Sequence, residues 1–125
     1  MGVIVDISCR SCQADWQCMT GCGLMHGTLE HVADLFPDEM KQEILEYGKQ
    51  AEIPLFDFGY RLAVCPDCGG MVSVPVVRML ETYQAYVGPC PDCGKPVRLA
   101  RDLSKTACPV CHEKSLEVKE TGCWD

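Results

Sequence analysis

Short apolar runs rich in β-branched residues recur along the 125-residue chain and predict small strands. The predicted strands are at 3–8, 13–17, 61–64, 71–77, 82–87, 97–100 and 116–119. We expect 3–8 and 13–17 to form one hairpin, and 97–100 and 116–119 to form a last small one. Pro75 inside 71–77 lacks a backbone N–H, which predicts a sheet edge or a bulge there.

Between the second and third of these runs the apolar spacing becomes helical. Thr28 is a typical N-cap. Leu29, Val32 and either Leu35 or Phe36 follow at helical spacing up to Pro37, before which a helix should stop. A second helix is predicted from Pro37, with its apolar stripe at positions 40, 44, 47 and 51. We expect 18–27 to be a loop or a poor helix, because it contains three glycines, and 53–60 to be an aromatic connection over the core.

Candidate chemistry lies in four cysteine pairs, each with two residues between the cysteines. The pairs are Cys9 and Cys12, Cys65 and Cys68, Cys90 and Cys93, and Cys108 and Cys111. This spacing lets both thiolates face one metal ion, and a glycine after the second cysteine helps the backbone to turn toward sulfur. We therefore predict that these eight cysteines are metal ligands, with structural zinc favoured and two ions in all.

The segments 65–69 and 90–94, both Cys-Pro-Asp-Cys-Gly, resemble the knuckles of zinc-ribbon and rubredoxin-like proteins. That resemblance implies short antiparallel strands that carry two knuckles around one metal ion. It covers less than half of the chain and leaves 18–60 without a parallel. Cys12 and Cys111 are followed by Gln13 and His112, so these two knuckles depart from the pattern.

Spacing alone does not decide which knuckles share a metal. In the favoured scheme, 90/93 pairs with 108/111 and 65/68 pairs with 9/12, so that two sites close with four thiolates each. In the alternative, 65/68 pairs with 90/93, 9/12 closes with Cys18 and Cys22, and 108/111 recruits Cys123 and a histidine. Mixed ligation is a further alternative.

Charge narrows the range of functions. The formal charge is −7 with neutral cysteines, and a zinc ion held by four thiolates has a net charge of −2, so two sites would give about −11. Such a chain is a poor generic ligand for nucleic-acid phosphates, although Lys95, Arg98, Arg101 and Lys105 form a local basic run. We expect a cytoplasmic protein with reduced cysteines, because the first residues do not resemble a secretion signal and no apolar run is long enough to span a membrane.

Some residues receive no role at this point. Cys18, Cys22 and His26 stand at i, i+4 and i+8, but the glycines among them disfavour a helix. Cys123 lies near the end of the chain, where we expect a frayed tail.

The sequence thus predicts an α+β protein with small antiparallel strands in two zinc-ribbon-like units. The first unit is 1–88 with a two-helix insertion at about 28–50, and the second is 89–125. The favoured function is a zinc-binding protein-interaction or adaptor module whose partner is another protein. A rubredoxin-like iron electron carrier is the alternative, and a nucleic-acid-binding ribbon comes third. We find no catalytic constellation, so an enzyme is disfavoured; the sequence does not specify an oligomeric state.

Overall fold

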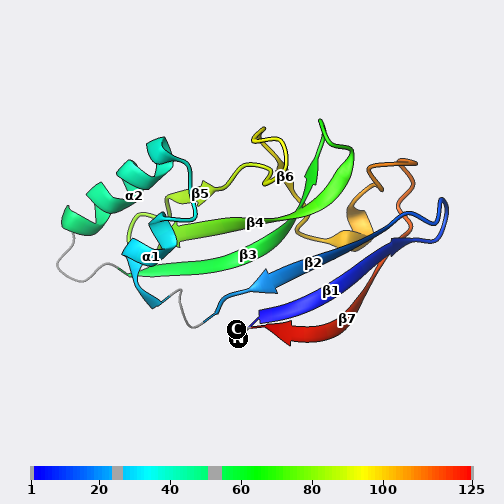
Figure 1. The fold of residues 1–125 in the computed structure, drawn as a ribbon, viewed down its shortest axis with the longest axis horizontal. Coiled ribbons are helices and arrows are strands. Elements are labelled where there is room, and N and C mark those ends of the chain that lie inside the picture. The colour runs from blue at the N-terminus through cyan, green and yellow to red at the C-terminus, as the bar shows by residue number, and fades with distance from the viewer. Residues whose placement is uncertain (1, 24–26, 51–54, 125) are drawn as a thin grey trace.

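The computed structural model describes residues 2–23, 27–50 and 55–124. Over these residues the chain forms a seven-stranded sheet with two helices at one end (Figure 1). The strands are β1 (Gly2–Cys9), β2 (Asp15–Gly21), β3 (Phe56–Cys65), β4 (Gly70–Met79), β5 (Ala85–Val87), β6 (Arg98–Leu99) and β7 (Leu116–Trp124). The helices are α1 (Leu29–Ala33) and α2 (Asp38–Gln50), and a short 3-10 helix spans Leu103–Lys105. The predicted α+β class and the two-helix insertion between strands are therefore confirmed.

All described strand pairs are antiparallel, and the strand order is β5-β4-β3-β2-β1-β7, with β6 paired to β3 beside this path. Strand β7 lies along β1, with Trp124 opposite Gly2 and Leu116 opposite Cys9. The predicted hairpin of 97–100 with 116–119 is wrong, because β6 pairs with β3 and β7 pairs with β1. Strands of both predicted units thus belong to one sheet, and the division at residue 88 stays a prediction.

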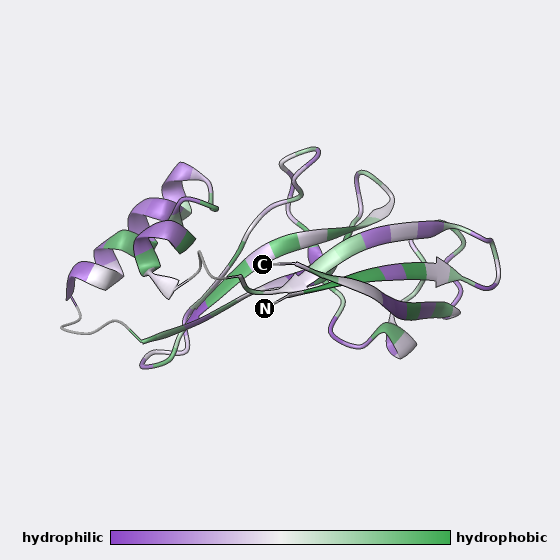
Figure 2. Cartoon of the chain, turned by 60° about the horizontal axis from the view of Figure 1, so that its bottom comes forward, coloured by the Kyte–Doolittle hydropathy of each residue, from purple (hydrophilic) through white to green (hydrophobic). Residues whose placement is uncertain are grey.

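The β3–β4 hairpin is packed against different partners along its length. At the helical end, Phe58, Val77 and Met79 form a core with Leu29 and Ile44. At the opposite end a second core joins Val64 and Met71 to side chains of β1, β2 and β7. Hydrophobic and hydrophilic residues alternate along the strands, as expected for sheets with faces in different surroundings (Figure 2).

The helices follow the predicted signals. The Thr28 hydroxyl accepts a hydrogen bond from the backbone N–H of His31 at 3.5 Å and caps α1. In α2, Ile44 is fully buried, and Met40 and Tyr47 pack against the same core; Ala51 lies outside the described residues. The stripe on α2 is therefore covered by the sheet, and the outer face of the helix is left to polar and acidic residues.

Several boundaries differ from the predictions. The segment 53–60 is not a connection throughout, since β3 already begins at Phe56. Strand β2 continues through 18–21, where the sequence predicts a loop or a poor helix. Cys123 and Trp124 are not frayed: they belong to β7, and the Trp124 indole Nε1 donates to the Thr20 carbonyl at 3.0 Å.

Pro75 lies within β4, which has neighbours on both sides. Its carbonyl accepts a hydrogen bond from the Gly88 N–H at 2.8 Å, while the β5 pairing begins only at Val76. The N–H and C=O of one strand residue point to the same side of the strand, and the Pro75 carbonyl points toward Gly88. The N–H that proline lacks would therefore point to the same place, just beyond the end of β5 at Val87. The proline is thus at an edge only locally. No helix among the described residues combines the length and apolar character needed to cross a bilayer.

Candidate metal centres

Eight cysteines are brought together in two groups of four. Within each group the sulfur atoms all lie within 4.8 Å of one another. Centre 1 consists of Cys9, Cys12, Cys108 and Cys111, and centre 2 consists of Cys65, Cys68, Cys90 and Cys93. These are the eight cysteines predicted as ligands, and each group could hold a metal ion.

The sulfur positions suit a tetrahedral ion. The Sγ–Sγ distances are 3.5 Å for Cys9–Cys111 and 3.7 Å for Cys12–Cys108 in centre 1. In centre 2 they are 3.5 Å for Cys65–Cys93 and 3.8 Å for Cys68–Cys90. A Zn–S bond of about 2.3 Å places the sulfurs of a tetrahedron about 3.8 Å apart, whereas a disulfide would bring them to about 2.0 Å. The donor set and its spacing therefore fit zinc, and they fit iron equally in chemical type.

The four knuckles share one backbone turn. In each, the residue after the second cysteine donates its N–H to the carbonyl of the first cysteine. The donors are Gln13, Gly69, Gly94 and His112, at 2.8 to 3.0 Å. These donors also have φ between 66° and 74°, in the left-handed region. Two knuckles that lack the glycine of the resemblance therefore make the same turn with a side chain present.

Backbone amides also point at sulfur inside the turns. The N–H of Cys68 donates to Cys65 Sγ at 3.4 Å, and the N–H of Val110 donates to Cys108 Sγ at 3.4 Å. The backbone N–H of Cys68 lowers the pKa of Cys65 to about 7, and that of Cys12 lowers the pKa of Cys9 to about 7. One thiol in each centre is therefore disposed to lose its proton near neutral pH, which favours metal binding because thiolates are the ligands.

The observed pairing is nested and corrects both predicted schemes. Centre 2 joins the β3–β4 turn to the segment after β5, and β6 then returns to β3 with Leu99 opposite Ala63. Centre 1 joins the β1–β2 turn to the segment before β7, although Cys12 and Cys108 are 96 positions apart. The alternative scheme paired 65/68 with 90/93 as observed, but it closed 9/12 with Cys18 and Cys22 instead of with 108/111.

The pairing of β1 with β7 is the physical reason for this correction. Cys9 lies opposite Leu116, so the knuckle just before β7 arrives beside the knuckle just after β1. Contacts outside the sulfurs reinforce the approach: the Ser11 and Ser115 hydroxyls lie 2.7 Å apart, and Arg10 forms an ion pair with Glu117 at 3.2 Å. Closing a long loop is a small obstacle, because the entropy cost rises only with the logarithm of loop length.

The remaining cysteines lie outside both centres. Cys18 is buried in β2, and burial raises the pKa of its thiol, as expected for an inert core residue. Cys22 packs against the helical core, and Cys123 is exposed on β7. His26 lies outside the described residues, while His31 is an exposed residue at the start of α1.

No protein-family model, curated protein or solved structure matches the chain. The two four-cysteine groups are thus the firmest guide to function.

The nested pairing predicts which cysteines share an ion. We expect Cys9→Ser and Cys108→Ser to lose the same single metal, and Cys65→Ser and Cys90→Ser to lose the other. The test is the metal content per chain of each single variant and of each double variant that combines two of these substitutions. Pairs within one centre should leave one metal, whereas Cys9→Ser combined with Cys65→Ser should leave none; one remaining ion in that last variant would contradict the pairing.

The left-handed positions predict opposite effects of substitution. His112→Gly should stabilise the zinc-loaded protein by about 1 kcal/mol, because a residue with a Cβ is strained at this φ. Gly69→Ala should destabilise it by about the same amount, because a Cβ is strained at this φ as well. The added Cβ meets no atom within 4 Å, so a steric clash does not add to this cost. Denaturant unfolding at saturating zinc measures both, with His112→Ala, which removes the imidazole but keeps the Cβ, as the control. A loss of stability in His112→Gly would show that the imidazole supports centre 1.

Proposed function

We propose that this chain is a protein-interaction module held in shape by two structural zinc ions. The observation that carries the metal half of the proposal is the sulfur spacing: in each centre all four sulfurs lie within 4.8 Å of one another, and two Sγ–Sγ distances are 3.5 to 3.8 Å. Four cysteines fill the four positions of a tetrahedral zinc ion, whereas catalytic zinc keeps one position for water or substrate. The centres therefore support a structural role.

The segments that the two centres attach also favour a structural role for the metals. Each centre fastens a segment with little regular structure, 88–97 or 100–115, to the turn of a long hairpin. Bound zinc contributes about 10 to 16 kcal/mol in small zinc-finger peptides, which is ample to hold such segments in place.

The acidic face of α2 supports the interaction half of the proposal. Residues 28–57 contain eight acidic and two basic side chains, a net of −6. In α2, Glu39, Glu43 and Glu46 are exposed at helical spacing, on the side away from buried Ile44. A surface of this kind suits a partner protein with a basic patch and repels nucleic acid.

Metal analysis tests the structural half. We expect the protein purified from its own cell to be colourless, to contain two zinc ions per chain, and to unfold when a strong chelator removes them. Atomic emission spectrometry measures the zinc content, and circular dichroism measures the unfolding. A red protein with iron in either centre and a reversible one-electron couple would support the rubredoxin-like alternative instead.

Charge removal on α2 tests the interaction half. The variant with Glu39→Gln, Glu43→Gln and Glu46→Gln should lose a partner that is captured from the protein's own cell at low salt. The matched control replaces three exposed carboxylates elsewhere, Asp15→Asn, Glu81→Gln and Glu120→Gln, and should retain the partner. Equal capture by both variants would contradict docking on α2.

A further inference from the structure

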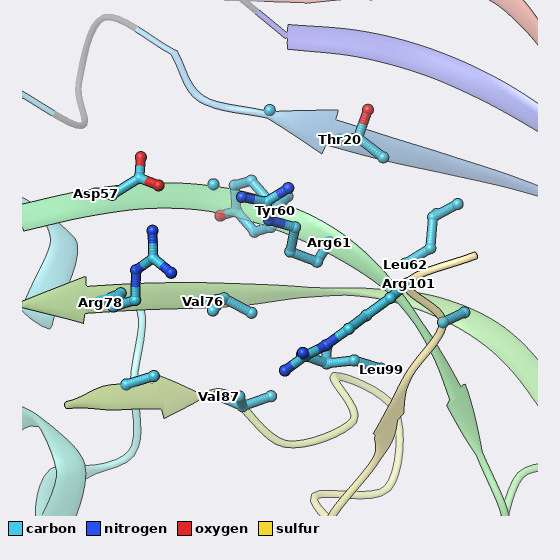
Figure 3. Close-up of a pocket in the computed structure, with 14 residues that line it drawn as sticks. Thr20, Asp57, Tyr60, Arg61, Leu62, Val76, Arg78, Val87, Leu99 and Arg101 are labelled. Carbon is cyan, nitrogen blue, oxygen red and sulfur yellow. The ribbon is translucent and has the colours of Figure 1, made fainter. Parts of the chain in front are cut away.

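Among the described residues, one face of the β3–β4–β5 region is buried mainly at the end near centre 2. Toward centre 2, Ala63, Val72 and Val74 on this face are buried together with Cys90. Farther along the strands, the register places Gly59, Val76 and Val87 side by side on the same face, followed by Asp57, Arg78 and Ala85. There the surface is hollowed into a cavity of about 720 Å³ (Figure 3).

Three arginines from three different segments line this cavity. Arg61 comes from β3, Arg78 from β4, and Arg101 from the chain just after β6 (Figure 3). All three are exposed, and neither of the two ion pairs among the described residues, Arg10–Glu117 and Lys41–Asp34, involves them. The sequence grouped Arg101 with Lys95, Arg98 and Lys105, but of these only Arg101 lines the cavity.

The cavity is positive within an acidic protein. Three guanidinium groups and the single carboxylate of Asp57 give it a net charge of +2, against −7 for the chain. Asp57 lies opposite Arg78 in the strand register but forms no ion pair with it. Guanidinium groups bind carboxylates and phosphates through paired N–H donors, so this grouping favours an anion.

Most of the remaining lining is apolar, with the polar side chains of Thr20 and Tyr60 among it. Val76, Val87 and Leu99 contribute side chains beside the arginines (Figure 3). A volume of about 720 Å³ falls in the range of about 300 to 1,000 Å³ that is usual for small-molecule sites. We propose that this cavity binds a small organic anion whose apolar body lies on the valines and Leu99 and whose carboxylate or phosphate is held by Arg61, Arg78 and Arg101.

This binding site goes beyond the proposed function, because neither zinc binding nor docking on α2 requires it. It is tested with the full, zinc-loaded chain and octanoate or octyl phosphate as probes, by calorimetry and by amide shifts in NMR spectra. Saturable binding is expected, with shifts confined to 20–21, 57–62, 76–87 and 99–101. Octanol, which lacks the charge, and inorganic phosphate, which lacks the apolar body, should each bind at least about tenfold more weakly.

Substitution locates the site. Arg61→Gln, Arg78→Gln and Arg101→Gln should each weaken octanoate about tenfold, the usual scale for one charge-assisted contact. Arg98→Gln is the matched control: Arg98 pairs with Val64 in the register, adjacent to Leu99 and therefore on the opposite face, and its loss should change affinity less than about twofold. The zinc content of every variant is measured, so that loss of a metal centre is distinguished from loss of the anion site.

Four results would overturn the proposal. The first is no saturable binding of either probe in the millimolar range, and the second is equal binding of octanoate and octanol. The third is an equal loss in Arg98→Gln and the cavity variants, which would indicate general attraction to positive charge. The last is binding of a leucine-terminated peptide through its free carboxylate when octanoate does not bind. That result would assign the cavity to the C-terminus of a partner protein and overturn the proposal of a small organic anion.

Discussion

The convergence of four sulfur atoms from two distant turns is the constraint on which this fold depends. In each centre one knuckle is the tip of a long hairpin, and the other belongs to a segment with little regular structure. The irregular segments bring few buried side chains of their own, so attachment at the knuckle determines where they lie. Within centre 1 and centre 2, Cys9, Cys65, Cys90 and Cys108 are all buried, which shows that the sulfurs are also part of the apolar cores.

The β3–β4 hairpin joins the parts of the molecule. Its turn carries half of centre 2, its helical end forms a core with α1 and α2, and its other end packs against β1, β2 and β7. Ser73 fastens the hairpin to β2 by donating to the Met19 carbonyl at 2.7 Å and accepting from the Met19 N–H at 2.9 Å. A disturbance of this hairpin would therefore reach the helices, the sheet and one metal centre together.

Local features of the fold could be predicted from the sequence, but long-range ones could not. The cysteine pairs, the Thr28 cap and the apolar spacing of α2 are encoded within a few residues, and the structure has each of them. The pairing of the centre 1 knuckles depends on β1 pairing with β7 across nearly the whole chain, and that of the centre 2 knuckles accompanies the return of β6 to β3. A short strand does not encode which distant strand it pairs with. The arginine-lined cavity could not be predicted for the same reason. Arg61, Arg78 and Arg101 come to one cavity only because β3 pairs with both β4 and β6.

The nested arrangement of the centres imposes an order on their assembly during synthesis. All four ligands of centre 2 lie between residues 65 and 93, so it can close while the rest of the chain is still being made. Centre 1 has to wait for Cys108 and Cys111, and until then Cys9 and Cys12 are exposed as a pair without its partner. Centre 2 is therefore the first of the two whose ligand set is complete during synthesis, and centre 1 is the second.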